Sequence, residues 1–201
     1  SEIGCVPMLE LCVPLSKPKP DCEAFLKAVL TDEPQDRPRL IEYLINEPVM
    51  RPIVQMMGRE WVAPRGGRAT MEAYWDNFIV FWYRLGYDFV RLELGLPFRK
   101  GAARVADDGR AYAETGSGPI SSWGEFEAYA WPEVTDEHFW PYEYIAARLP
   151  EGMGLICNHG GGIFEHVSRL FSLEGLCLAL CESPGLVEAV ANRMGETLLA
   201  Y

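Results

Sequence analysis

The chain has little positive charge: 18 Lys and Arg stand against 29 Asp and Glu, a formal net charge of −11 at pH 7. Nucleic acids and anionic membranes attract proteins mainly through clustered cations, so this balance argues against both as partners. The sequence also lacks an apolar run near the roughly 20 residues of a transmembrane helix. The early apolar stretch, 6–15, is interrupted by Pro7, Glu10 and Pro14 and follows no basic residue, unlike a secretory signal. We therefore expect a cytoplasmic protein.

None of the six cysteines forms a CxxC pair, which argues against zinc-finger and thioredoxin-like sites. Without a secretory signal, reduced thiols are expected. Cys177 and Cys181 are four residues apart and share one face of a predicted helix, where they could present two metal ligands. Because free cysteine is among the most buried residue types, we favour a packing role for both.

The remaining composition, 49% hydrophobic and 23% charged, is typical of a globular protein. Three short apolar runs predict strands at 40–45, 89–94 and 153–158. Apolar spacing and capping residues predict helices that begin near residues 21, 46, 71, 136, 163 and 183. Strands separated by long helices imply a parallel sheet, either a small open α/β sheet or part of a (β/α)8 barrel.

Two regions depart from this alternation. Residues 1–22 are rich in Pro and Cys and lack periodicity, which predicts an N-terminal arm before a folded region, 23–201. Residues 97–134 contain many Gly and Trp and are interpreted as a loop-like insertion, with a hairpin at Asp107-Asp108-Gly109. The apolar stripe from Tyr74 to Trp82 is predicted to be core.

Four segments of the chain carry a resemblance to a known protein family. They are residues 32–62, DEPQDRPRLIEYLINEPVMRPIVQMMGREWV, residues 83–98, YRLGYDFVRLELGLPF, residues 123–134, WGEFEAYAWPEV, and residues 154–194, GLICNHGGGIFEHVSRLFSLEGLCLALCESPGLVEAVANRM. In this order they resemble the opening, the second strand, the Trp-rich connection, and the third strand with its Gly-rich turn and paired helices of the uroporphyrinogen decarboxylase-like family. The similarity covers roughly residues 24–201.

The resemblance implies an α/β fold of the (β/α)8 TIM-barrel type. The family is usually longer than this chain, so only the N-terminal portion of the barrel is expected here. The family's chemistries are cofactor-independent decarboxylation of a tetrapyrrole and zinc-dependent methyl transfer between corrinoid proteins and acceptors such as thiols.

The decarboxylase motifs are altered in this sequence. The Arg-rich motif RQAGRY is replaced by INEPVMRP, which leaves Arg51 alone, and FSDIL is replaced by RLELG, where Glu93 is the nearest acid. A substrate with many carboxylates needs several guanidinium groups. We therefore favour methyl transfer involving a corrinoid or related carrier. Decarboxylation of uroporphyrinogen or another carboxylated substrate is the alternative, and a non-catalytic binding module is a third hypothesis.

The implied zinc ligands, His-x-Cys with a distant Cys, are expected beyond Tyr201, so no metal site is predicted within this chain. A decarboxylase would need no cofactor. A small molecule or a corrinoid protein is the expected partner, and a homo-oligomer is left open.

Active sites of such barrels lie at the C-terminal ends of the strands, which singles out nine residues. The predicted catalytic residues are His159, Glu93, Glu42 and His166. The predicted substrate-binding residues are Asn158, Gly160, Gly161, Glu165 and Arg91. We expect Glu42, Glu93 and His159 to converge at one sheet edge.

Most of these residues also have a structural interpretation. His159 could be a loop histidine that bonds to the backbone, and His166 could pack beneath its helix. Glu165 more simply satisfies the helix dipole. The two strand acids could pair with Arg91 or Arg39, and the Gly160–Gly162 run could be an anion cradle or only a tight turn.

Overall fold

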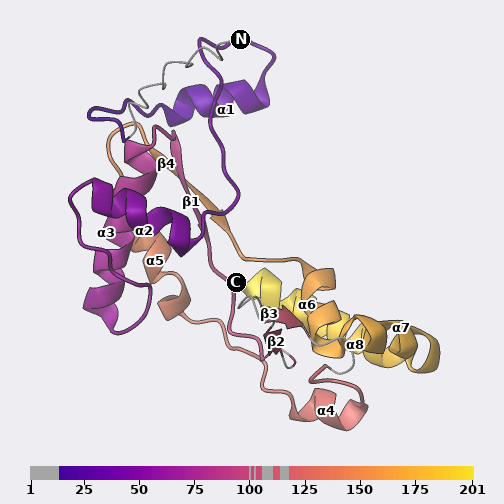
Figure 1. The fold of residues 1–201 in the computed structure, drawn as a ribbon. Coiled ribbons are helices and arrows are strands. Elements are labelled where there is room, and N and C mark those ends of the chain that lie inside the picture. Colours follow the sequence, from indigo (N-terminus) through magenta and orange to yellow (C-terminus); the bar gives the residue numbers. More distant parts are fainter. Residues whose placement is uncertain (1–13, 100, 102, 106–110, 114–117) are drawn as a thin grey trace, which may run out of the picture. The chain divides into compact units, whose positions relative to one another are not determined.

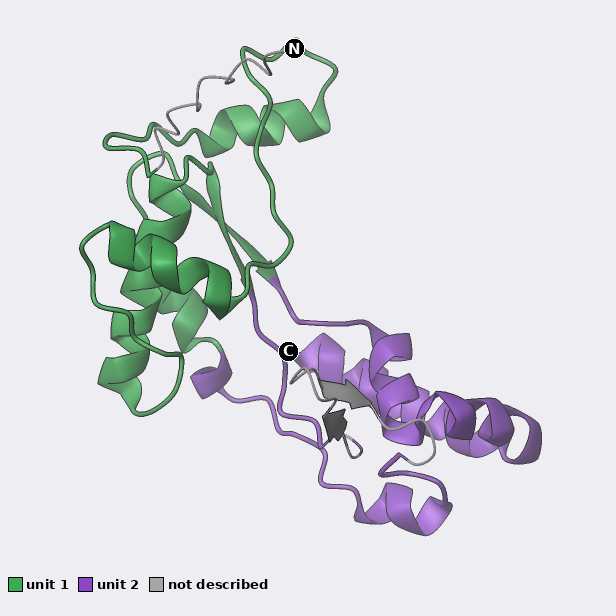
Figure 2. Cartoon of the chain, in the orientation of Figure 1, with its two compact units in different colours: residues 1–92, 139–157 green, residues 93–138, 158–201 purple. Residues whose placement is uncertain are grey.

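The computed structural model describes residues 14–99, 101, 103–105, 111–113 and 118–201. Most of the predicted arm, residues 1–13, lies outside the described residues, as does the predicted turn at 107–109. The chain folds into two compact units (Figure 2). Unit 1 comprises residues 1–92 and 139–157, and unit 2 comprises residues 93–138 and 158–201. No helix in the described part of the chain is long and apolar enough to cross a membrane.

A two-stranded parallel sheet pairs β1 (Phe89–Glu93) with β4 (Gly154–Asn158), as the sequence predicts. The backbone N–H of Gly154 donates to the carbonyl of Asp88 (3.0 Å), and that of Leu94 donates to the carbonyl of Asn158 (3.2 Å). The two strands therefore advance in the same direction and end side by side (Figure 1). Parallel strands must be joined by a long connection. Here the connection is the stretch of about 60 residues between β1 and β4, which contains other helices and strands.

The prediction of a strand at 40–45 is wrong, because this segment is irregular in the structure. The Tyr43 carbonyl, which a sheet ladder would use, accepts from the guanidinium of Arg91. The same guanidinium lies 3.9 Å above the Tyr43 ring. A side chain of β1, not its backbone, therefore holds this segment. Its apolar side chains are correspondingly exposed, as at Leu40, Ile41, Tyr43 and Leu44.

The described residues of unit 1 form four helices, α1 (Cys22–Leu30), α2 (Glu47–Met56), α3 (Arg68–Arg84) and α5 (Trp140–Ala146). The predicted core role of the α3 stripe is confirmed, since its apolar members are buried: Tyr74, Trp75, Phe78, Ile79, Phe81 and Trp82. The helix packs against α2 and α5 (Figure 1), so it buries two sides. The Asp21 carboxylate caps α1 by accepting from the N–H of Ala24 (2.9 Å).

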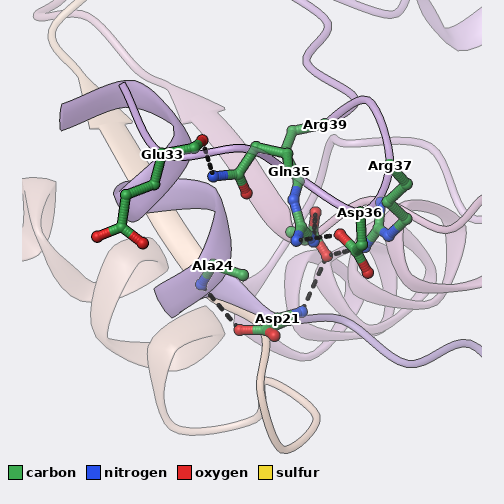
Figure 3. A network of polar contacts seen from close by, with 8 residues as sticks. Asp21, Ala24, Glu33, Gln35, Asp36, Arg37 and Arg39 are labelled. Carbon is green, nitrogen blue, oxygen red and sulfur yellow. Dashed lines mark hydrogen bonds and ion pairs between the residues drawn. The ribbon is translucent and has the colours of Figure 1, made fainter. Parts of the chain in front are cut away.

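A buried ion network joins α1 and the 36–39 segment to the start of β1. Asp88 is fully buried, and its carboxylate accepts from Arg37 (2.6 Å), from Arg39 (3.5 Å) and from the backbone N–H of Asp21 (2.9 Å). Arg39 also donates to Asp36 (3.0 Å), and Figure 3 shows Asp21, Asp36, Arg37 and Arg39 close together. A buried carboxylate is tolerated only with such partners, so the network stabilises this corner of unit 1.

Where it is described, unit 2 contains the hairpin β2 (Ala103–Val105) and β3 (Ala111–Ala113), two short helices and three longer ones. The short helices are α4 (Trp123–Ala128) and the 3₁₀ turn η1 (Asp136–His138). The longer helices are α6 (Ile163–Phe171), α7 (Leu173–Glu182) and α8 (Pro184–Ala200). The antiparallel pairing of Ala103 with Ala113 confirms the predicted hairpin. The longer helices pack on one another around a core that includes Leu170, Phe171, Leu186, Val190 and Met194.

Three helix boundaries differ from the sequence predictions. The 97–134 region is not only loop, since α4 follows the N-cap residue Ser122, whose hydroxyl accepts from the N–H of Glu125 (3.4 Å) and donates to the Glu125 carboxylate (3.1 Å). The helix predicted from Asp136 is divided into two elements, the 3₁₀ turn η1 and the helix α5. The second element, α5, begins beside Pro141. The segment after Ile163 breaks at Ser172, whose positive φ of 66° ends α6 and whose side chain caps α7.

The prediction that Cys177 and Cys181 pack in the core is wrong, because both side chains are exposed on α7. Leu176 is the residue of this helix that is buried. The spacing placed the two cysteines on one face, but the packing of α7 decides which face lies outside.

Candidate active site

The C-terminal ends of β1 and β4 meet in unit 2. Glu93 ends β1 and Asn158 ends β4, and the Leu94–Asn158 backbone hydrogen bond joins the chain segments there. Two loops leave this point, one through Gly95 and one through His159 and Gly160. We call Glu93, Gly95, Asn158, His159 and Gly160 the strand-end cluster.

The two loops cross closely because glycine stands at both contact points. A Cβ at Gly95 would lie 3.3 Å from the His159 carbonyl oxygen, tighter than most side chains tolerate. Gly160 has a φ of +72°, and a Cβ there would lie 3.6 Å from Cγ of Glu93 and 3.6 Å from Cα of Gly95. The Glu93 side chain thus runs along the Gly160 backbone. The predicted neighbourhood of Glu93 and His159 is present in the structure.

Backbone amides of the Gly-rich turn donate to side chains that lie close to them in the sequence. The N–H of Gly160 donates to the Asn158 side-chain oxygen (3.3 Å), and the N–H of Gly162 donates to the Glu165 carboxylate (2.7 Å). Two of the donors that an anion cradle would offer are therefore occupied by the chain itself. This geometry favours the tight-turn interpretation, and it gives Glu165 the role of an N-terminal cap of α6.

The two histidines near the turn differ in exposure. His159 is exposed after β4, whereas His166 is 5% exposed and its ring lies 4.8 Å from that of Phe98. His166 therefore packs beneath α6, the second of its two predicted positions. An exposed imidazole can reach a ligand, so His159 is the better placed of the two for acid–base chemistry.

Two predicted site residues belong to unit 1. Glu42 is exposed in the irregular 40–45 segment, and its carboxylate accepts from the neighbouring N–H of Tyr43 (2.9 Å). Arg91 holds the Tyr43 carbonyl and ring, as described above. The expected convergence of Glu42 with Glu93 and His159 depended on a strand at 40–45, which the structure does not contain.

Sequence reasoning missed Tyr201, whose hydroxyl donates to the carbonyl of Leu94 (3.1 Å). This bond joins α8 to the loop that follows Glu93, and the Tyr201 ring stands edge-on to His138 at 6.2 Å. No local pattern signals a contact between residues 107 positions apart.

Among the described residues, no three His, Cys, Asp or Glu side chains gather in the way a metal site requires. Comparison of the chain with protein-family models, with curated proteins and with solved structures finds no match.

Proposed function

We propose that the chain is part of a uroporphyrinogen decarboxylase-like enzyme that transfers a methyl group from a corrinoid or related carrier, with the strand-end cluster in its active site. The observation that carries the proposal is the parallel pair β1–β4, whose ends bring Glu93 beside Asn158, His159 and Gly160. Enzymes built on parallel α/β sheets bind substrates at this edge. The proposal includes the finer fold, in which β1 and β4 are neighbouring strands of a (β/α)8 barrel.

The residue types in the cluster support methyl transfer over decarboxylation. Glu93, Asn158 and His159 provide one carboxylate, one carboxamide and one imidazole. These groups can orient a ligand and move a proton, but they do not clamp many carboxylates, which guanidinium groups do best. Arg91, the predicted substrate cation, is held by Tyr43 in unit 1.

In this mechanism the corrinoid supplies the methyl group, and the protein prepares the acceptor. The exposed imidazole of His159 accepts the proton of an acceptor thiol, which makes the more nucleophilic thiolate. Asn158 fixes the turn that carries His159, because its side chain accepts from Gly160 N–H.

The test compares wild type with His159→Gln in two assays, each with added Zn²⁺. The first follows optically the demethylation of methylcobalamin by 2-mercaptoethanol, and the second follows carboxylate loss from uroporphyrinogen by chromatography. We expect demethylation above the buffer rate, and a fall of about 100-fold in the variant. The variant should retain its stability within about 1 kcal/mol, since His159 is exposed.

Three results would overturn the proposal. Carboxylate loss without demethylation would establish the alternative chemistry. Binding of cobalamin without turnover would indicate a non-catalytic module. Unchanged turnover in a folded His159→Gln variant would remove His159 from the site.

A further inference from the structure

A cavity in unit 1, separate from the strand-end cluster, lies between α1 and the segment that follows it. It opens widely to solvent, and its volume is about 510 Å³. We call it the α1 cavity. Its apolar wall is formed by Phe25, Ala28 and Val29 of α1 together with Ile41. Arg37 and Arg39 line it too, and both belong to the Asp88 network.

Arg39 is the unusual member of this lining. Its side chain is 9% exposed, and its buried Nε has no hydrogen-bond acceptor among the described residues. An unsatisfied buried donor costs about 1–3 kcal/mol, so a native site rarely leaves one without a purpose. The remaining guanidinium contacts are a long one to Asp88 (3.5 Å) and one to Asp36 (3.0 Å).

We propose that the α1 cavity binds a carboxylate that carries an apolar chain. The ligand's carboxylate would accept from the Arg39 guanidinium, and the chain would lie on the apolar wall of Phe25, Ala28 and Val29. A guanidinium is the side chain best suited to this head group, because its donors match a carboxylate in a fork geometry.

Asp36 is the competitor that sets the affinity. Its side chain is 76% exposed, so water solvates it in either state, and it occupies Arg39 only through the contact to one terminal nitrogen. A ligand carboxylate takes this place and adds the apolar contacts that Asp36 lacks. The proposal therefore predicts that removing the Asp36 charge strengthens ligand binding.

The test is a titration of the ¹⁵N-labelled 201-residue chain with sodium octanoate, followed by two-dimensional NMR. Saturable shifts are expected at the amides of Ala28, Val29 and Ile41. Because each buried methylene contributes about a fourfold factor in affinity, hexanoate, which lacks two of them, should bind about 15-fold more weakly. The uncharged 1-octanol should also bind at least about 10-fold more weakly than octanoate, since it lacks the charge-assisted bond.

Substitutions on exposed positions keep the test independent of folding. Asp36→Asn should tighten octanoate binding by about threefold or more, because it removes the competing carboxylate. Val29→Glu, at a side chain that is 66% exposed, should weaken binding by about 10-fold by placing a like charge on the wall. Val49→Glu on α2, 53% exposed, is the matched control and should leave affinity unchanged.

Several outcomes would refute the proposal. They are shifts confined to residues outside the α1 cavity, equal affinities for octanol and octanoate, and a weaker or unchanged affinity in Asp36→Asn. Arg39→Gln should abolish the preference for octanoate over octanol. If that variant fails to fold, Asp36→Asn and Val29→Glu still decide the question.

Discussion

Replacing Asp88 with Asn should destabilise unit 1 by about 3 kcal/mol. Asp88 is fully buried and its carboxylate accepts from Arg37, Arg39 and the backbone N–H of Asp21. Removing one partner of a buried ion pair typically costs about 3–5 kcal/mol, because the remaining charge stays desolvated. Arg37 is 37% exposed and can be resolvated, whereas Arg39 is 9% exposed and cannot, so the lower end of that range applies.

The assay is urea unfolding followed by tryptophan fluorescence. Four of the six tryptophans belong to unit 1, which are Trp61, Trp75, Trp82 and Trp140. For a unit of this size the slope is roughly 1–2 kcal/mol per M urea, so the midpoint should fall by about 2 M. Asp36→Asn is the matched control, because Asp36 binds the same Arg39 from an exposed position, and we expect a change below about 0.5 kcal/mol there. A loss below about 1 kcal/mol in Asp88→Asn would refute this account of the network.

The other predictions concern one glycine, one tyrosine and one thiol. Gly118→Ala should destabilise unit 2 by about 3 kcal/mol in thermal melts, because a Cβ there would lie 2.0 Å from the Leu170 carbonyl oxygen. Gly124→Ala, with nothing within 4 Å, is its control and should be neutral or slightly stabilising; equal effects at the two positions would contradict the packing described here. Burial, with a smaller contribution from the charge of Glu47, raises the pKa of Tyr74 from 10.0 to about 12. Stability from protonated Tyr74 is therefore complete below pH 10 and is lost between about pH 10 and 12, by roughly 2–3 kcal/mol, and a Tyr74→Phe variant that shows the same loss would disprove the assignment. Partial desolvation raises the pKa of the Cys157 thiol although the residue is exposed, so its labelling by a disulfide reagent at pH 8, followed by mass spectrometry, should be slower in the folded protein than in urea; equal rates would contradict a raised pKa.

The sequence predicted the helices and strands that are marked by capping residues or by a regular spacing of apolar residues. Asp21 and Asn46 precede α1 and α2 as their N-caps, and Ser183 precedes α8. The apolar period of α3 marked a helix buried on two sides, and the structure confirms it. The apolar runs at 89–94 and 153–158 predicted β1 and β4, and long helices between strands predicted that the pair would be parallel. Capping residues and apolar periodicity involve residues that are close together in the sequence. They can therefore be recognised without knowledge of the tertiary structure.

The same reasoning failed where a partner distant in the chain decides the outcome. Residues 40–45 have the composition of a strand, but a strand exists only when a neighbour supplies its hydrogen bonds, and here Arg91 binds the Tyr43 carbonyl instead. Cys177 and Cys181 have the preferences of core residues, but the side of α7 that packs on its neighbours buries Leu176.

The candidate sites also contain some residues that the sequence indicated and some contacts that only the folded structure forms. The sequence alone indicated Glu93, Asn158 and His159, because each stands at the end of an apolar run. The tertiary structure alone brought the hydroxyl of Tyr201 to the carbonyl of Leu94 and enclosed Asp88 between Arg37 and Arg39. The physical reason is that a hydrogen bond or ion pair depends on separations of a few ångströms, which the folded chain sets and the spacing of residues along the sequence does not.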